Sequence, residues 1–387
     1  MVTMITTTQG HRGTQNILQV RRVLDISDTI YLLEPEAAPL YVFVSKLNKA
    51  SSVNTTFQWI EDELNPSWDT TSTSETSATE TVDVDHGTYF NKYDLVKVPR
   101  TGEVMLVTAI DTNDLTVVRG YGETGCADTA ANEPIVIIGS AFQEGSANTE
   151  LVTKSTRTER QYNYAQIFRK SVEITESLAN SELYGGNDRD YQRKKKGIEL
   201  MRDFERSFLY GDRFEDTGSK DTGVVHARRI TGGALFFITT NATDAGGTFT
   251  ESEFETFLRS VFRYGSKSRY LFCSPLVNSV ISQWAIGKLQ MVPKDKTYGI
   301  AITQYLSPHG TVNLVNDVML EGATYGGYAL AIELEELRYR YLQNRDTKMK
   351  TDIQHPGDDF LKDAYLAEIG LEFRQERKHG YVYGVSG

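Results

Sequence analysis

A long amphipathic segment in the middle of the chain constrains the fold more than any other feature. Residues 188–210, DRDYQRKKKGIELMRDFERSFLY, place most of their apolar groups close to one helical face and charged groups on the other. The apolar face contains Tyr191, Ile198, Met201, Phe204 or Glu205, and Phe208. At about 1.5 Å per residue this helix spans roughly 35 Å. A helix of that length with one apolar stripe is typical of a flat or elongated domain.

The residues after this helix alternate between helical and extended patterns. Thr250 and Glu253 form a capping box before a second helix whose apolar residues recur at helical spacing up to Gly265. An apolar strand at 269–273 leads into Ser274-Pro275, which starts another helix. Strand-like runs follow as TVNLVNDVML, YALAIELEELRYRYL and AYLAEIGLEFRQE. This order predicts an α/β layer in the second half of the chain.

Residues 87–141 form the clearest all-β stretch of the sequence. Short extended runs are separated by turn signals at 99–102 and 111–114, and the run PIVIIGSA closes the set. These patterns predict a small inserted β-module.

The glycines of this module match G-x-G-x-x-G, at Gly120, Gly122 and Gly125, after the strand-like run LTVV. A dinucleotide-binding turn would need a helix beginning at the third glycine, with its N-terminus at the pyrophosphate. Instead, fewer than ten residues separate Gly125 from Pro134 and the next strand. We therefore interpret the motif as a turn between two strands.

Two segments have too few core residues to fold alone. Residues 1–30 are polar and weakly patterned, which predicts an extended arm. Residues 69–85, DTTSTSETSATETVDVD, are rich in Ser and Thr and acidic, which predicts a solvated loop or one ordered only by a neighbour.

Charge and hydropathy exclude several classes of protein. The formal net charge of −11 argues against charge-driven wrapping of nucleic acid. The N-terminus lacks the apolar core of a signal peptide, and no run approaches the ~18 apolar residues of a membrane span. Lys194, Lys195 and Lys196 stand among acidic residues, which favours a solvated helix face over a nucleic-acid patch.

No residue pattern points to catalysis, a cofactor or a metal. Cys126 and Cys273 do not form a disulfide framework, and the six histidines lack metal-ligand spacing. Four carboxylates could hold a cation, and Asp358 and Asp359 among them could serve an unrecognised enzyme site, although a solvated acidic loop is the favoured interpretation. These are Asp352, Asp358, Asp359 and Asp363. We predict no catalytic, cofactor-binding or metal-binding residue, and a protein that is not an enzyme.

The order of these features resembles the major capsid proteins of tailed bacteriophages with the HK97-like fold. The resemblance is carried by GEVMLVTAIDTNDLTVVRGYGET, by QIFRKSVEIT before the helix ending DFERSFLYGDR, and by HGTVNLVNDVML with YALAIELEELRYRYLQNR and HGYVYGV. Together these cover most of residues 87–387, and their order is the specific part.

The resemblance implies an α+β chain with four parts. Residues 1–60 would be the N-terminal arm, and 61–165 the extended loop with the β-module at 87–141. Residues 166–265 and 341–387 would form the peripheral domain around the spine helix at 188–210, and 266–340 the axial domain.

The implied function is a structural subunit that self-assembles into an icosahedral head around double-stranded DNA. The expected location is the virion, after assembly in the host cytoplasm. The expected partners are copies of the chain, as pentamers and hexamers. Scaffolding, portal and decoration proteins are further candidates, whereas sequence-specific DNA binding and a membrane are not expected. The alternative hypothesis is a phage tail, decoration or adhesion protein with a β-rich module.

Overall fold

The computed structural model describes residues 38–47, 49–146, 155–181, 186–218, 226–288, 292–297 and 300–386. The chain divides into two compact units. Unit 1 combines Met1–Trp59 with Tyr162–Gly387, and unit 2 is Ile60–Gln161. The predicted polar arm at residues 1–30 lies outside the described residues.

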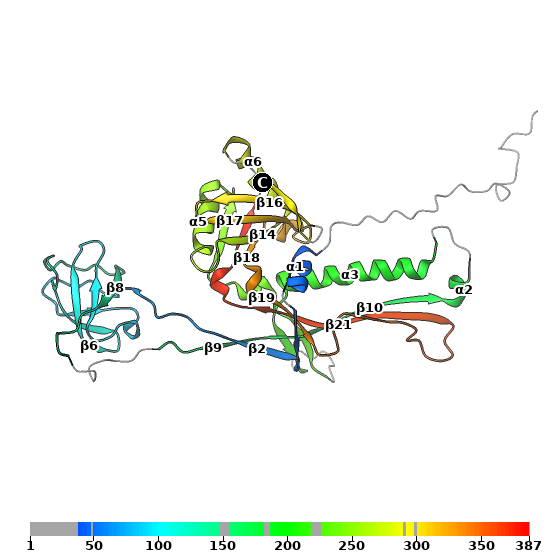
Figure 1. The fold of residues 1–387 in the computed structure, drawn as a ribbon, viewed down its shortest axis with the longest axis horizontal. Coiled ribbons are helices and arrows are strands. Elements are labelled where there is room, and N and C mark those ends of the chain that lie inside the picture. Colours follow the sequence, from blue (N-terminus) through cyan, green and yellow to red (C-terminus); the bar gives the residue numbers. More distant parts are fainter. Residues whose placement is uncertain are drawn as a thin grey trace, which may run out of the picture. The chain divides into compact units, whose positions relative to one another are not determined.

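The long helix of unit 1 has the predicted bounds. α3 (Asp188–Tyr210) begins after Asn187, whose side chain accepts a hydrogen bond from the Arg189 amide at 2.9 Å. The helix runs beside a long antiparallel pair, β10 (Gln166–Thr175) and β21 (Phe360–Phe373) (Figure 1). Every residue of β10 is paired with β21. The helix therefore packs as one layer on a second layer formed by this long strand pair.

The buried face of α3 differs from the predicted one. Met201 is 38% exposed, and Tyr191 and Ile198 are only half-buried. The fully buried positions are Leu200, Phe204, Glu205, Phe208 and Leu209. The prediction was partly wrong because it assumed a single stripe along the whole helix. Near its C-terminus α3 also packs against α1 (Pro39–Leu47), which widens the covered face.

Five strands form the sheet that α3 covers. Their order is β1, β19, β21 and β10, with β20 paired to β21 beyond the end of β19. β1 and β19 are parallel, and the other pairs are antiparallel. The strands not yet given are β1 (Lys49–Ser52), β19 (Leu337–Leu342) and β20 (Lys348–Lys350).

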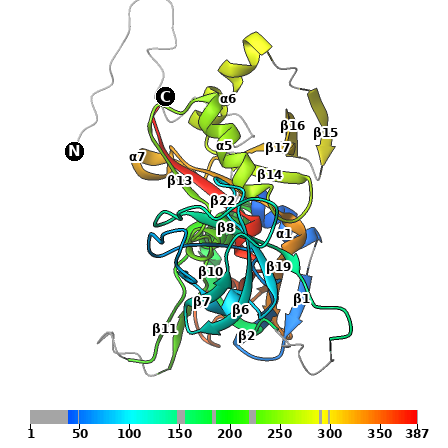
Figure 2. The ribbon, with the colours of Figure 1, turned by 90° about the vertical axis from the view of Figure 1, so that its left-hand side faces the viewer.

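A seven-stranded mixed sheet forms the second part of unit 1, with α5 (Glu251–Val261) and α6 (Pro275–Lys288) beside it (Figure 2). The predicted capping box is confirmed, because Thr250 accepts from the Glu253 amide and Glu253 accepts from the Thr250 amide. The strand order is β13 (Ala242–Gly247), β22 (Gly380–Val385), β18 (Ala329–Ile332), β14 (Ser268–Cys273), β17 (Gly310–Asn316), β16 (Ile300–Ser307), β15 (Val292–Thr297).

Short elements complete unit 1, and two of them, β2 and β9, run across its boundary with unit 2. β2 and β9 pair with each other, as do β11 and β12. Thr175 caps the short helix α2, because its side chain accepts a hydrogen bond from the Leu178 amide. The bounds are β2 (Thr56–Glu61), β9 (Glu159–Tyr164), β11 (Phe214–Asp216), β12 (Arg228–Ile230), α2 (Glu176–Ala179), α4 (Ala234–Phe237) and α7 (Gly322–Tyr325). No helix in the described ranges is long and apolar enough to cross a membrane.

Unit 2 contains a six-stranded antiparallel barrel with its own apolar core. Its order is β3, β8, β5, β6, β7, β4, and the end strands meet through a bridge between Thr71 and Val84. The strands are β3 (Trp68–Thr70), β4 (Thr81–Asp83), β5 (Asp94–Lys97), β6 (Val104–Asp111), β7 (Asp114–Val118) and β8 (Pro134–Ser140).

The sequence patterns predicted residues 69–85 as a loop outside a β-module at 87–141. This prediction was wrong, because these residues belong to the barrel. They supply β4 and most of β3, and Thr71, Val82 and Val84 are completely buried. The Ser- and Thr-rich composition concealed two short strands whose single inward-facing residues suffice to close the barrel.

The loop after β7 contains the G-x-G-x-x-G match and no helix, which confirms that the motif is a turn. Gly120 has φ +57°, and a Cβ there would lie 2.9 Å from the Cys126 sulfur. The backbone conformation and the limited space therefore both favour glycine at this position, so nucleotide binding is not needed to explain it.

Candidate assembly surfaces

The root of the β2/β9 strand pair is fixed to unit 1 by stacked aromatic rings. Trp59 lies 5.8 Å from Phe237, between ring centroids, and Phe237 stacks on Phe373 at 5.6 Å. Gly370 permits β9 and Phe57 to approach β21, since a Cβ there would lie 2.5 Å from the Tyr164 carbonyl oxygen and 2.8 Å from the Phe57 ring. The strand pair therefore leaves unit 1 from a rigid base.

Asn163 on β9 reinforces the same root. Its side-chain amide donates to the Thr231 hydroxyl at 3.1 Å and to the carbonyls of Gly232 and Leu371 at 3.0 and 2.7 Å. Its oxygen accepts from the amides of Tyr164 and Gly232, each at 2.8 Å. A fully buried amide with this many partners fixes the direction of β9.

A buried carboxyl group holds the N-terminus of α1. Glu205 accepts hydrogen bonds from the backbone amides of Leu40 and Tyr41 at 2.8 and 2.7 Å. These are among the amide groups that have no partner within a helix, so Glu205 completes the N-terminus of α1. Burial, followed by the charge of Asp317, raises the pKa of Glu205 well above its usual range.

Arg269 on β14 is a second buried anchor. Its guanidinium donates to the carbonyls of Ser266 at 2.7 Å and Lys378 at 3.1 Å, and it lies 3.3 Å from the Glu333 carboxylate. It therefore links β14, the turn before it and the segment leading to β22. Burial lowers the pKa of this guanidinium.

Ion pairs connect α3 to the ladder. Asp363 on β21 accepts from Arg189 at 2.7 Å and from Arg193 at 2.9 Å. These hydrogen bonds outweigh burial and lower the pKa of Asp363. Arg189 also bonds Asp352 at 2.6 Å. Asp352 and Asp363, two of the four acidic residues considered as cation ligands, thus form ion pairs with arginine.

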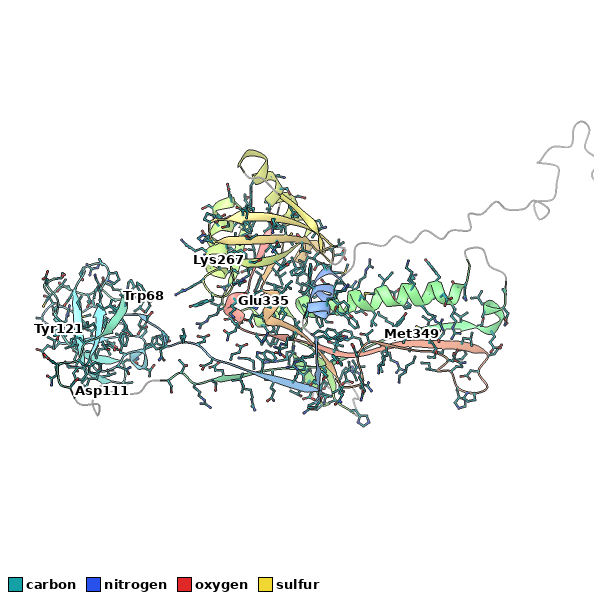
Figure 3. The ribbon with its side chains drawn as sticks, viewed as in Figure 1. Trp68, Asp111, Tyr121, Lys267, Glu335 and Met349 are labelled. Atoms are coloured by element: carbon teal, nitrogen blue, oxygen red, sulfur yellow. The ribbon has the colours of Figure 1, made fainter. Side chains whose placement is uncertain are left out.

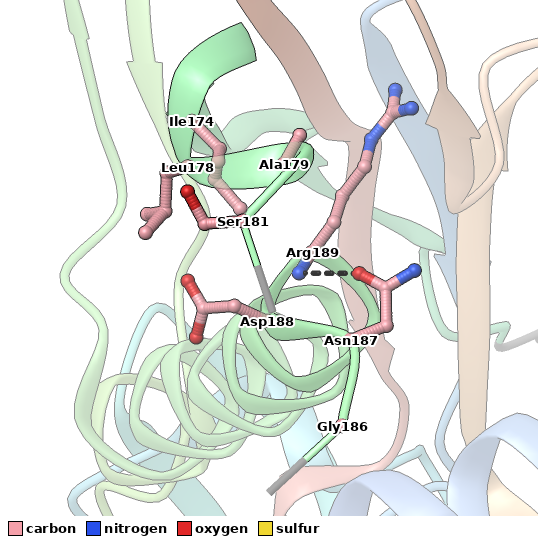
Figure 4. A pocket seen from close by; sticks show the side chains of 8 residues that line it. All are labelled: Ile174, Leu178, Ala179, Ser181, Gly186, Asn187, Asp188 and Arg189. Carbon is pink, nitrogen blue, oxygen red and sulfur yellow. Dashed lines mark hydrogen bonds between the residues drawn. The ribbon is translucent and has the colours of Figure 1, made fainter. Parts of the chain in front are cut away.

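Of the other charged residues considered in the sequence, Asp358 accepts from the His355 amide and Lys196 pairs with Glu199 at 2.7 Å. No cluster of metal-ligating side chains is found in the described part of the chain. A shallow cavity of about 270 Å³ beside the start of α3 is lined in part by Asn187 and Arg189, which are already bonded (Figure 4).

The barrel is held by two ion pairs that sequence analysis did not identify. Glu103 and Arg119, almost completely buried, form two parallel hydrogen bonds of 2.8 and 2.9 Å. Arg100 bonds Glu133 in the same way at 2.7 and 3.0 Å. Such paired geometry orients both side chains and makes the barrel rigid.

Both units expose large apolar side chains. In unit 1, Val53 is 89% and Ile167 is 54% exposed. In unit 2, Leu64 is 93% exposed, and Trp68 and Tyr121 are about half exposed on the barrel (Figure 3).

A spine helix along a long ladder, a separate mixed sheet and a strand pair leading to an inserted barrel define an HK97-like capsid fold. A solved structure of Mycobacterium phage Bobi resembles the chain with a TM-score of 0.52 at 8% identity, covering 97% of this chain and 99% of the other. The capsid of a native GTA particle gives a TM-score of 0.50 at 8% identity, with 96% and 98% covered. At this identity the likeness shows the fold alone.

Sequence comparisons identify the family. The SU10 major capsid protein profile matches residues 4–386. The chain belongs to this family. It is 21% identical over 269 residues to the major capsid protein of Pseudomonas phage PaMx41, which covers 67% of this chain and 64% of that relative. The predicted capsid resemblance is confirmed, and the alternative of a tail, decoration or adhesion protein gains no support from these matches.

Proposed function

We propose that this chain is the structural subunit of a virion capsid, which self-assembles into an icosahedral head around double-stranded DNA. The family match over residues 4–386 carries the proposal. The rigid root of β2 and β9 supports it, because a shell needs defined contacts between many copies. Pentamers and hexamers are the proposed building blocks.

We also propose the domain ranges implied by the resemblance, with one addition. Residues 166–265 and 341–387 form the peripheral domain and 266–340 the axial domain. β13 and β22 come from the peripheral ranges, yet β22 is hydrogen-bonded to β18 in the seven-stranded sheet. We therefore assign these two strands to the axial domain.

Further partners and the absence of enzymatic activity remain part of the proposal. A scaffolding protein, a portal and decoration proteins are the proposed partners, and the family supports a structural role. Assembly in the host cytoplasm is proposed on the same basis.

Sedimentation and negative-stain microscopy of the purified full chain test the proposal. We expect closed particles or rings of five and six subunits. A single compact monomer at every protein and salt concentration would contradict it.

A further inference from the structure

The net charge of the chain resides entirely in unit 2. Ile60–Gln161 contains 18 Asp and Glu but 7 Lys and Arg, whereas the other 285 residues contain 34 of each kind. Unit 1 is therefore neutral and unit 2 carries the whole formal charge of −11. A need for solubility alone does not explain why the charge is confined to one unit.

Unpaired carboxylates gather at one end of the barrel. Asp83 on β4 lies directly opposite Asp114 on β7, and Asp114 lies opposite Asp111 at the end of β6. Asp111 is visible on the barrel surface in Figure 3. None of the three forms an ion pair within the described ranges, and like charges directly opposite one another destabilise a ladder. We call Asp83, Asp111 and Asp114 the acidic row.

Unit 1 has a surface of opposite charge on the sheet face turned away from α3. Arg169 on β10 lies opposite Leu366 on β21, and Leu366 lies opposite Lys348 on β20. Two positions along, Lys350 lies opposite Ala364. Strand residues alternate between faces, and Phe168, which neighbours Arg169, packs in the core with α3. Arg169, Lys348 and Lys350 therefore share the outer face.

These three cations are exposed and form no ion pair with a described carboxylate. Other charges near them form ion pairs, since Lys362 pairs with Glu173 and Arg345 pairs with Glu368. Ile167, 54% exposed, adds an apolar group beside them. We call Arg169, Lys348 and Lys350 the basic face.

We propose that the basic face of one copy docks the acidic row of the barrel from a second copy. The acidic row spans the three adjacent strands β4, β7 and β6, and the basic face occupies β10 and β20 on either side of β21, with neighbouring strands about 4.8 Å apart. The two patches therefore have opposite charge, the same number of charged groups and the same width of three strands. This inference rests on the proposed shell function, because only an assembly brings many copies together.

Electrostatics would make this contact orienting and weak. Exposed ion pairs each contribute little to affinity, and salt screens them over about 10 Å at 0.1 M. Complementary charge mainly steers partners and suppresses wrong orientations. A weak contact repeated over a shell permits correction during assembly and becomes effective through multivalency.

Charge reversal and mixing test the docking. One variant reverses the basic face (Arg169→Glu, Lys348→Glu, Lys350→Glu) and the other reverses the acidic row (Asp83→Lys, Asp111→Lys, Asp114→Lys). Each alone should assemble about ten-fold less than wild type at 0.1 M salt. An equimolar mixture should recover assembly, because each reversed surface then meets its opposite on the other variant.

The outcomes separate this proposal from others. If wild type forms particles and each charge-reversed variant alone assembles equally well, the docking is overturned while the shell function stands. If wild type never assembles, the shell function itself is overturned. If mixing fails to restore assembly, the contact lies within one chain or the basic face meets DNA phosphates. Loss of DNA binding in the basic-face variant alone would identify the latter.

A second measurement does not depend on variants that fold. Carbodiimide joins amines to carboxylates that are in contact, and mixed isotopic labelling separates links between chains from links within one. Wild-type particles should give links between chains from Lys348 or Lys350 to Asp111 or Asp114. Particles without these links would overturn the proposal.

Discussion

Glu205 in the middle of unit 1 accepts a 2.7 Å hydrogen bond from the backbone amide of Tyr41, 164 residues earlier in the chain. The contact joins the spine helix α3 to the N-terminus of α1. Burial raises the pKa of Asp317 nearby to about 6, and burial together with Asp317 raises the pKa of Glu205. The junction between α1 and α3 therefore depends on a carboxyl group that favours its protonated form.

Replacing Glu205 with Gln should make the unfolding free energy of dissociated subunits fall less steeply than that of wild type between pH 4 and pH 8. Gln removes the ionisation but keeps only one oxygen acceptor, so one of the amides of Leu40 and Tyr41 loses its partner at every pH. Because the folded-state pKa values of Glu205 and Asp317 are raised, their contribution is complete below the unfolded pKa. This stabilisation is lost as the pH rises from the unfolded-state pKa to the folded-state pKa. The loss is about 1.4 kcal/mol for each pH unit between the two pKa values. Urea unfolding across this range measures the effect.

Glu205→Ala is the matched control for this prediction. It leaves the amides of Leu40 and Tyr41 buried without an acceptor, at a cost of about 1–3 kcal/mol each at every pH. Parallel pH profiles for wild type and Glu205→Gln would show that the buried carboxyl group does not set the pH dependence.

His379 should make the chain sensitive to acid. Its Nδ1 accepts from the Glu333 amide at 3.2 Å, and its Nε2 lies 3.0 Å from the Arg374 carbonyl. Burial, with the nearby cations of Arg269 and Lys378, lowers the pKa of His379 to about 3. The neutral ring therefore contributes stability above the unfolded pKa of 6.5, and this is lost as the pH falls toward 3.

His379→Gln removes this titration and can keep one donor and one acceptor. Its unfolding free energy should fall less steeply than that of wild type between about pH 6.5 and 4. Equal slopes would mean that other groups, such as the carboxylates of the α3 ion pairs, dominate acid unfolding.

The Glu103–Arg119 pair should control the stability of the barrel separately from unit 1. Arg119→Met leaves a buried carboxylate without its cation, which costs about 3–5 kcal/mol. Adding Glu103→Gln removes the stranded charge and should restore much of the loss. Hydrogen exchange of the β6 and β7 amides in the full chain measures the effect, and the β10 and β21 amides serve as the internal reference. Equal loss of protection in both units would contradict the local role.

Local sequence patterns predicted several helices and strands. They did not predict the buried polar contacts, because the partners of those contacts lie far apart in the sequence. The bounds of α3 and the capping box at Thr250 follow from neighbouring residues, so periodicity found them. α1 was missed, although Pro39 at its first position and apolar residues three and four apart are a helical signal. Asn163 bonds Leu371 from 208 residues away, and no local pattern marks such a partner.

Paired substitutions on α3 test the corrected helix face. Phe204 is fully buried, with its ring 4.9 Å from Phe168 and 5.0 Å from Tyr41. Phe204→Asp places an unpaired charge among these rings and should abolish soluble protein. Met201→Asp, three residues earlier, changes a side chain that is 38% exposed and should leave the yield of soluble protein close to wild type. Comparing soluble with total protein after expression measures the effect of both substitutions. A larger loss of soluble protein for Met201→Asp than for Phe204→Asp would favour the helix face predicted from the sequence.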